Sequence, residues 1–207
     1  MIILSIEGLD KAGKHTAMTT LKAQYERIGL TVGTMDFPDY TTPTGELIGQ
    51  WLRGEAAFDY AAFELLLAAD KQVGQQRILQ HEARGVDVLI IDRYYHSQLA
   101  YGSVDNDPEW LESITKYLRK PDAVVYMSVS VEESMLRRGK HGDNDKYESD
   151  AKRLEQVKDR YETMLRSNDE CLVEWVDANN TKDVVTVHVE MAGNMIYRKF
   201  KEAGRIG

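Results

Sequence analysis

Residues 2–16 read IILSIEGLDKAGKHT, and this segment indicates the fold class. It begins with the apolar run Ile2–Ile6, which has the length of a strand, and it leads into a helical period over Lys14–Ile28. Between the two, residues 8–14 match the pattern G-x-x-x-x-G-K. In that pattern the glycines turn backbone N–H groups toward a phosphate, and the helix N-terminus adds partial positive charge. This order predicts a P-loop that holds the phosphates of a nucleoside triphosphate.

Along the rest of the chain, short apolar runs alternate with longer amphipathic segments, a pattern typical of parallel strands joined by helices. Strands are predicted at Ile2–Ile6, Thr31–Phe37, Val86–Ile91, Ala123–Val129 and Cys171–Val176. Helices are predicted at Lys14–Ile28, Thr44–Arg53, Ala61–Ala83, Pro108–Leu118, Val131–Arg138, Ser149–Arg166 and Lys182–Lys201. We therefore expect one domain, residues 1–207, with the P-loop NTPase fold: a three-layer α/β/α sandwich around a five-stranded parallel sheet.

One segment differs from all the others. Residues 138–146 read RGKHGDNDK, with two glycines, dense charge and almost no apolar residue. Such a composition predicts a mobile loop. We expect a lid over about residues 138–148 that closes to exclude water from the reaction.

The charge balance limits the possible partners. The chain has 34 acidic against 26 basic residues, a net charge of −8, so a basic surface for nucleic acid is not expected. The single Cys171 excludes an intrachain disulfide and suits a reducing compartment. Since no segment approaches the ~20 apolar residues of a membrane span, we expect a cytoplasmic protein without a membrane partner.

The residue after the lysine of the glycine loop is unusual. Ser or Thr normally stands there and ligates Mg²⁺ through its hydroxyl, but this chain has His15. Mg²⁺ prefers hard oxygen ligands, so an imidazole is a poor substitute. Thr16 is one residue too late for the metal, although its hydroxyl suits a phosphate oxygen. The sequence thus predicts ATP binding and leaves the placement of the metal open.

Further blocks continue the pattern in order over nearly the whole chain, and together they resemble the thymidylate kinases, which phosphorylate dTMP with Mg·ATP. The blocks are Ile6–Thr16, Asp36–Gly45, Asp92-Arg93-Tyr94 with Ser97 and Ala100-Tyr101, Lys120-Pro121-Asp122, Lys146-Tyr147-Glu148, and Val176-Asp177-Ala178. The resemblance implies Mg²⁺ as cofactor, ATP and a deoxynucleoside monophosphate as partners, and a homodimer. The apolar run Ala61–Ala69 suits a dimer interface, although a buried core helix would explain it equally well.

The resemblance also implies roles for individual residues. The phosphoryl transfer is assigned to Lys11, Lys14, Asp92 and Arg93, with Asp92 supporting Mg²⁺ through water. ATP binding is assigned to Gly8, Ala12, Gly13, Lys14, His15, Thr16 and Arg137. Acceptor binding is assigned to Asp10, Phe37, Tyr40, Leu67, Lys71, Arg93, Ser97, Tyr101 and Tyr147. The lid offers Arg137, Arg138, Lys140 and Lys146 as alternatives to Lys11 for stabilising the transferred charge.

The departures from the family pattern gather around the acceptor. Leu67 stands where family members have a Phe that stacks on thymine, and Lys71 stands where they have an Arg that binds the base carbonyl. Tyr40 replaces an Arg that contacts the acceptor phosphate. These changes leave two readings open. We favour an active kinase, with dTMP as the leading acceptor and a different or modified pyrimidine deoxynucleotide as the alternative. The other interpretation is a weak kinase that mainly binds nucleotide.

Two other functions fit parts of the sequence. A deoxynucleoside kinase would need a carboxylate base to activate a neutral 5′-hydroxyl, and Glu7 or Asp36 is a candidate. A regulatory protein that binds nucleotide would need the glycine loop alone. A nucleoside monophosphate kinase needs no such base, because a phosphate oxygen of the acceptor is already nucleophilic.

Overall fold

The computed structural model describes residues 1–138 and 150–206. Within them, five parallel strands form one sheet in the order β2-β3-β1-β4-β5. The strands are β1 (Ile2–Glu7), β2 (Val32–Asp36), β3 (Val88–Asp92), β4 (Ala123–Ser128) and β5 (Leu172–Asp177). All six residues of β1 are buried, as expected for the central strand of a sheet covered on both faces. The predicted α/β fold with a five-stranded parallel sheet is confirmed.

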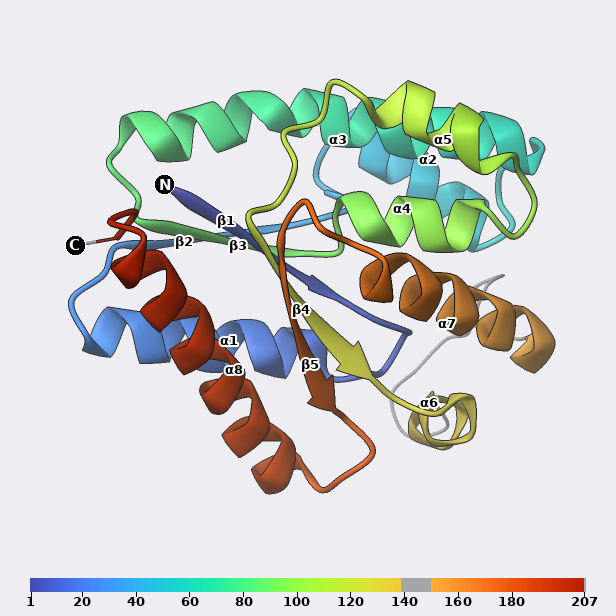
Figure 1. The fold of residues 1–207 in the computed structure, drawn as a ribbon. Helices are drawn as coiled ribbons and strands as arrows, with labels where there is room; N and C mark the ends of the chain where they lie inside the picture. Colours follow the sequence, from blue (N-terminus) through green and yellow to red (C-terminus); the bar gives the residue numbers. More distant parts are fainter. Residues whose placement is uncertain (139–149, 207) are drawn as a thin grey trace.

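Helices cover both faces of the sheet (Figure 1). The first, α1 (Lys14–Arg27), packs with α8 (Lys182–Glu202) on one face. The opposite side carries α2 (Pro43–Leu52), α3 (Tyr60–Ala83), α4 (Tyr95–Gly102), α5 (Pro108–Thr115) and α7 (Ala151–Arg166), while α6 (Val131–Arg138) follows β4. None of the described helices is both long and apolar enough to cross a membrane.

The alternation of side chains along the strands decides which residues face α1. Val88 and Ile90 of β3 belong to the same buried cluster as Leu21 of α1. Leu89 and Ile91 belong to the cluster that contains Ile78 of α3. Because successive side chains of a strand point to opposite faces, the residue that follows Ile91 points to the α1 side. That residue is Asp92.

One helix was absent from the sequence prediction. The helix α4, Tyr95–Gly102, has buried side chains at nearly every position, including His96, Gln98 and Tyr101. A short helix buried all round has no polar face, so it gives no helical period in the sequence. The ends of the other elements differ from the prediction by up to three residues, as at α5, which ends at Thr115 before the predicted Leu118.

The carboxyl ends of the strands position the site. In open parallel sheets, ligands bind beyond these ends, where the loops meet. Here the loop after β1 is the glycine loop, Phe37 follows β2 and Arg93 follows β3. The Arg93 backbone N–H donates to the Ile6 carbonyl at 3.0 Å, which joins the ends of β1 and β3. Residues far apart in the sequence therefore lie together at one edge.

Candidate active site

The glycine loop has the backbone that its sequence predicts. Gly8 and Gly13 have φ of 141° and 93°, in the left-handed region that favours glycine. At Gly8 a Cβ would lie 2.6 Å from the Met127 carbonyl oxygen, so β4 leaves no room for a side chain. Gly13 is the residue directly before α1, and the backbone therefore turns into the helix at the predicted point.

Lys14, the first residue of α1, lies buried beneath the loop. Its Nζ donates to the carbonyl oxygens of Leu9, at 2.8 Å, and Gly8, at 3.3 Å. Burial, together with the nearby charge of Arg93, lowers the pKa of Lys14 to about 8. A phosphate bound in the loop would oppose that shift and favour the ammonium form.

Most predicted acceptor residues line one cleft of about 430 Å³. The predicted residues in its wall are Asp10, Phe37, Tyr40, Leu67, Lys71, Asp92, Arg93, Ser97 and Tyr101. Asp36, Pro38, Ile48, Leu52, Phe63 and Gln98 complete the wall. The cleft is lined by apolar and aromatic side chains with a few charged groups, which is the usual make-up of a site for a small organic ligand.

An ion pair occupies the end of this cleft next to the glycine loop. The Arg93 guanidinium donates to Asp10, and the Tyr101 hydroxyl donates to the same carboxylate at 3.1 Å. The guanidinium also lies over the Tyr101 ring, 5.2 Å from its centroid. Burial alone would raise the pKa of Asp10, but the charges of Arg93 and Lys14 outweigh it and hold that pKa below its ordinary value. Arg93 is thus fixed in place with its charge intact.

The far end of the cleft carries a buried lysine and a buried amide. Burial lowers the pKa of Lys71 to about 8 against the attraction of Glu64 and Asp70. The Gln98 side-chain N–H donates to the Glu64 backbone carbonyl at 2.8 Å. Its Oε1 is buried and has no hydrogen-bond partner in the described part of the chain. One cationic donor and one amide acceptor therefore belong to the wall of the cleft.

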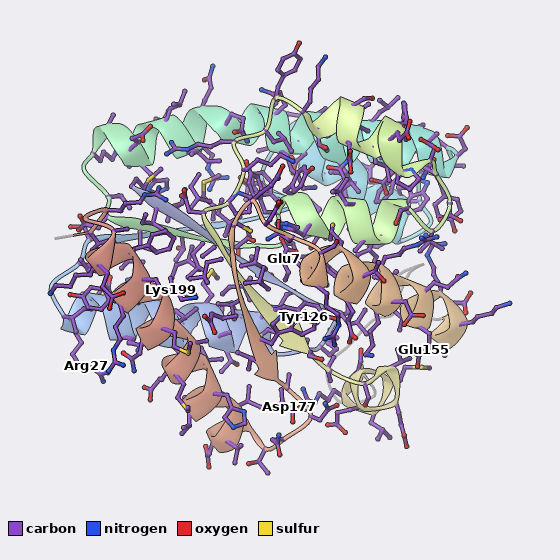
Figure 2. The ribbon with its side chains drawn as sticks, in the orientation of Figure 1. Glu7, Arg27, Tyr126, Glu155, Asp177 and Lys199 are labelled. Carbon is purple, nitrogen blue, oxygen red and sulfur yellow. The ribbon has the colours of Figure 1, made fainter. Side chains whose placement is uncertain are left out.

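Ser97 lines the cleft, but its hydroxyl faces the protein interior. It donates to Glu7, and it lies 2.7 Å from the Tyr161 hydroxyl. Glu7 is fully buried and also accepts from the Tyr94 backbone N–H at 3.0 Å. Burial raises the pKa of Glu7, with the hydrogen bond from Ser97 opposing the shift. Figure 2 labels Glu7 and Tyr126, both of which contact the Tyr161 side chain of α7. Glu7 thus ties β1 to α4 and α7.

A second cavity, of about 510 Å³, lies on the other side of the loop. Its lining includes the predicted Lys11, Ala12, Gly13, Thr16 and Arg137, together with Glu133, Asn180, Thr181, Lys182 and Val185. The Arg137 guanidinium donates to the carbonyls of Ala178, at 2.7 Å, and Lys11, at 3.3 Å. Arg137 therefore joins α6, the glycine loop and the segment before α8.

Three predicted ATP residues do not line this cavity: Gly8, Lys14 and His15. Gly8 packs against β4 and Lys14 lies under the loop, so both act through the loop itself. His15 is exposed at the start of α1. The predicted lid over residues 138–148, including Lys140, Lys146 and Tyr147, lies outside the described residues apart from the backbone of Arg138.

Oxygen atoms suited to Mg²⁺ lie in the wall of the acceptor cleft, on Asp36 and Asp92. Asp92 Oδ1 is buried and, among residues 1–138 and 150–206, has no hydrogen-bond partner. The neighbouring Asp36 lines the same cleft, and burial together with the charge of Asp92 raises its pKa. Carboxylate oxygens are ligands that Mg²⁺ accepts, directly or through water. The residues present thus fit the metal, even though His15 provides no oxygen.

The sequence prediction missed several lining residues. Gln98 directly follows Ser97 in a recognised block, but nothing in the sequence indicated that an amide would be buried there. Thr181 and Lys182 stand at the start of α8, a few residues after the Val176-Asp177-Ala178 block. Their position at a helix N-terminus beyond a strand was an available signal for a phosphate or nucleotide contact.

Comparisons with known proteins agree with this geometry. The family model described as thymidylate kinase matches residues 6–189. A thymidylate kinase from Dictyostelium discoideum is 28% identical over 97% of this chain and 88% of its own length, and one from Caenorhabditis elegans is 36% identical over 67% of each. A solved structure of thymidylate kinase from Candida albicans has a TM-score of 0.78 and 25% identity, covering 99% of this chain and 92% of its own. Fold, site and sequence agree: this chain belongs to the thymidylate kinase family.

Proposed function

We propose that this chain transfers the γ-phosphoryl group of ATP to dTMP, giving ADP and dTDP. The observation that carries the proposal is the position of two consecutive residues of the glycine loop. Lys11 lines the cavity on one side, and Asp10 lines the acceptor cleft on the other. The glycine loop therefore contributes to both a donor cavity and an acceptor cleft. The phosphoryl group would be transferred from one to the other beside this loop.

The residues around that point suit phosphoryl transfer. The attacking oxygen of the acceptor monophosphate is already negatively charged, so positioning and charge stabilisation are what the protein must supply. Arg93, held by Asp10 and Tyr101, is placed to bind the acceptor phosphate. Lys14 and the loop N–H groups hold the donor phosphates. Lys11, in the wall of the donor cavity, stabilises the charge of the transferred group. A bond forms between the acceptor oxygen and the γ-phosphorus as the bond to the β–γ bridging oxygen breaks, leaving ADP.

Mg²⁺ bound with ATP would screen the phosphate charges during this transfer. Asp92 is the residue best placed to hold its hydration shell, because its buried Oδ1 has no partner within the described residues. Lys14 and Arg93 align the donor and acceptor phosphates across the loop.

The far end of the cleft supports a thymine-type base. The hydrogen bond to Glu64 fixes the Gln98 amide in the wall of the cleft, and its buried oxygen, which has no partner among the described residues, is proposed as the acceptor for the base. Lys71 adds a donor. Thymine and uracil present an N3–H donor beside a carbonyl acceptor, whereas cytosine presents an acceptor at N3 beside an amino donor. We propose that the Gln98 oxygen meets N3–H and Lys71 meets the carbonyl at C4. In this order the pair complements dTMP and dUMP, whereas dCMP would set acceptor against acceptor and donor against donor. Leu67, with no aromatic ring, provides apolar contact without the stacking of a Phe.

The competing deoxynucleoside kinase needs a carboxylate base close to a neutral hydroxyl. Glu7 is buried, accepts hydrogen bonds from Ser97 and Tyr94, and is not part of the cleft wall. Asp36 lines the cleft and stays available as a base. The Arg93–Asp10 pair favours the kinase for monophosphates, because a nucleoside has no phosphate for Arg93 to bind.

A homodimer is supported by the outer side of α3, which runs along the top edge of the molecule in Figure 1. The exposed residues Leu65, Ala69, Gln72, Gln76 and Leu79 follow one another at alternating spacings of four and three. This is the spacing with which one helix meets a second helix. A second copy of the chain would cover these side chains.

The charge of the substrates supports a cytoplasmic location. Both ATP and deoxynucleoside monophosphates are charged molecules that do not cross membranes unaided. We therefore place the enzyme in the cytoplasm, where it would share a pool of nucleotides with the proteins that make and use them.

The test is an assay of ADP release with Mg·ATP and three acceptors: dTMP, thymidine and water alone. We expect turnover with dTMP and close to background ADP release with thymidine or with no acceptor. Turnover with thymidine but not dTMP would show a deoxynucleoside kinase. Nucleotide binding without turnover of any acceptor would show a binding protein.

A further inference from the structure

The ends of β2 and β3 place two carboxylates side by side. Asp36 and Asp92 are register partners, each the last residue of its strand. Adjacent strands lie about 4.8 Å apart, and partners in register on parallel strands direct their side chains to the same face. Both residues line the acceptor cleft beside Asp10 and Arg93.

These carboxylates face the start of α1. Val32 of β2 and Val88 and Ile90 of β3 pack into the cluster that contains Leu21 of α1. Asp36 and Asp92 have the same parity along their strands, so they lie on the α1 side of the sheet, beyond the apolar cluster. The first residues of that helix, Lys14 and His15, stand at the same edge.

Within the described residues, neither carboxylate forms a salt bridge with a cation. Asp92 Oδ1 is buried without a hydrogen-bond partner, and in the described part of the chain no salt bridge involves Asp36 or Asp92. The neighbouring cations bind elsewhere: Arg93 to Asp10, Arg77 to Asp39, and Lys14 to backbone carbonyls. Two adjacent acidic groups with no internal partner favour a cation from outside.

The same place in the chain lacks a metal ligand. The P-loop pattern supplies a hydroxyl to Mg²⁺ from the residue after the lysine, and His15 cannot replace it. Asp36 adds an oxygen ligand on the strand next to Asp92. We infer that Asp36 joins Asp92 in holding the Mg²⁺ of Mg·ATP and so replaces the hydroxyl that is missing at position 15. This inference rests on the proposed function, because the metal arrives with ATP.

Binding of the metal tests the inference without turnover. Mn²⁺ replaces Mg²⁺, and its free fraction is measured by electron paramagnetic resonance in the presence of protein and a non-hydrolysable ATP analogue. Asp36→Asn keeps the shape of the side chain and removes its charge. We expect it to weaken Mn²⁺ binding to the protein–nucleotide complex about 10-fold or more, the size of effect usual for residues that support a metal.

Two further variants give the comparison its controls. Asp159→Asn removes the same charge from an exposed position on α7 outside both cavities, and we expect Mn²⁺ affinity to stay at the wild-type value. His15→Ser restores the pattern hydroxyl. Added to Asp36→Asn, it should recover most of the lost Mn²⁺ affinity, while added to the wild-type chain it should increase that affinity only slightly.

The outcomes distinguish a metal-binding role of Asp36 from an acceptor-side role and from a failure of ATP binding. Wild-type Mn²⁺ affinity in Asp36→Asn would overturn the inference, and reduced turnover with that affinity unchanged would assign Asp36 to the acceptor side instead. Failure of His15→Ser to recover affinity in the double variant would overturn the replacement of the hydroxyl. If the wild-type chain binds no ATP analogue with EDTA or with Mn²⁺ present, the proposed function itself fails, and this result is distinct from the other two.

Discussion

At the scale of single residues, Asp10 and Arg93 connect the two halves of the site. Arg93 has φ of 58°, an uncommon conformation for a residue other than glycine, and its side chain reaches the Asp10 carboxylate. Asp10 lies within the glycine loop, so the loop proposed to bind ATP also orients the arginine proposed to bind the acceptor. A change at Asp10 should therefore affect the acceptor more than ATP.

Replacing Asp10 with Asn tests this connection. The amide keeps the shape but cannot balance the guanidinium charge, and losing a hydrogen bond to a charged group costs about 2–3 kcal/mol. We expect kcat/KM for dTMP to fall about 30- to 150-fold, with the KM for ATP nearly unchanged. Tyr101→Phe, which keeps the carboxylate and removes one hydrogen bond, should show a smaller loss. Equal losses for ATP and dTMP would contradict the assigned role.

Lys71 gives the enzyme an expected dependence on pH. Burial lowers its pKa to about 8, so the ammonium form is complete only well below that pH and is lost above it. The KM for dTMP at saturating Mg·ATP should therefore rise as pH increases through about 8. In Lys71→Arg, whose guanidinium stays charged, this rise should be smaller. Lys14 also has a pKa of about 8, but it is present in both proteins, so their difference reports Lys71. Parallel pH profiles would contradict this role.

At the scale of elements, α3 has an inner side that lines the cleft and an outer side that is exposed. Its inner side contributes Phe63, Leu67 and Lys71 to the acceptor cleft. Its outer side carries Leu65, which is 51% exposed, and Leu79, which is 59% exposed. Substitution of the outer side is therefore expected to change assembly while the cleft keeps its lining.

The oligomeric state tests the outer side of α3. Light scattering after gel filtration should give twice the mass of one chain for the wild type. We expect the double variant Leu65→Arg/Leu79→Arg to elute as a monomer, because two buried charges in a helix pair have no partners. Met191→Arg, at an equally exposed position of α8, should remain a dimer. A monomeric wild type, or a double variant that stays dimeric, would contradict this interface.

The elements differ in whether they could be predicted from the sequence. The strand, loop and helix at residues 2–27 were predictable because their apolar period and their glycines act locally. The helix α4 was not, because burial of nearly all its residues removes the amphipathic period. Gln98 lies in this helix and was missed with it. Its role depends on the Glu64 carbonyl, 34 positions earlier, which fixes the amide.

At the scale of the whole molecule, the strand order brings the predicted residues together. With β1 at the centre of β2-β3-β1-β4-β5, the ends of β2 and β3 lie beside the glycine loop, and nine predicted acceptor residues or catalytic residues line one cleft. The sequence blocks indicated these residues but not their distances. The pairing of Asp36 with Asp92 and the ion pair of Asp10 with Arg93 appear only once the sheet is assembled.

The proposed transfer of a phosphoryl group between the two cavities can be followed with a label. ATP labelled in the γ-phosphate is incubated with Mg²⁺, the chain and dTMP, dUMP or dCMP, and the products are separated by chromatography. We predict label in dTDP and dUDP, with dCMP at least about 100-fold poorer because two hydrogen bonds are mismatched. If, with every acceptor, the label remains in ATP or appears only as inorganic phosphate, the chain does not transfer the phosphoryl group to a nucleoside monophosphate.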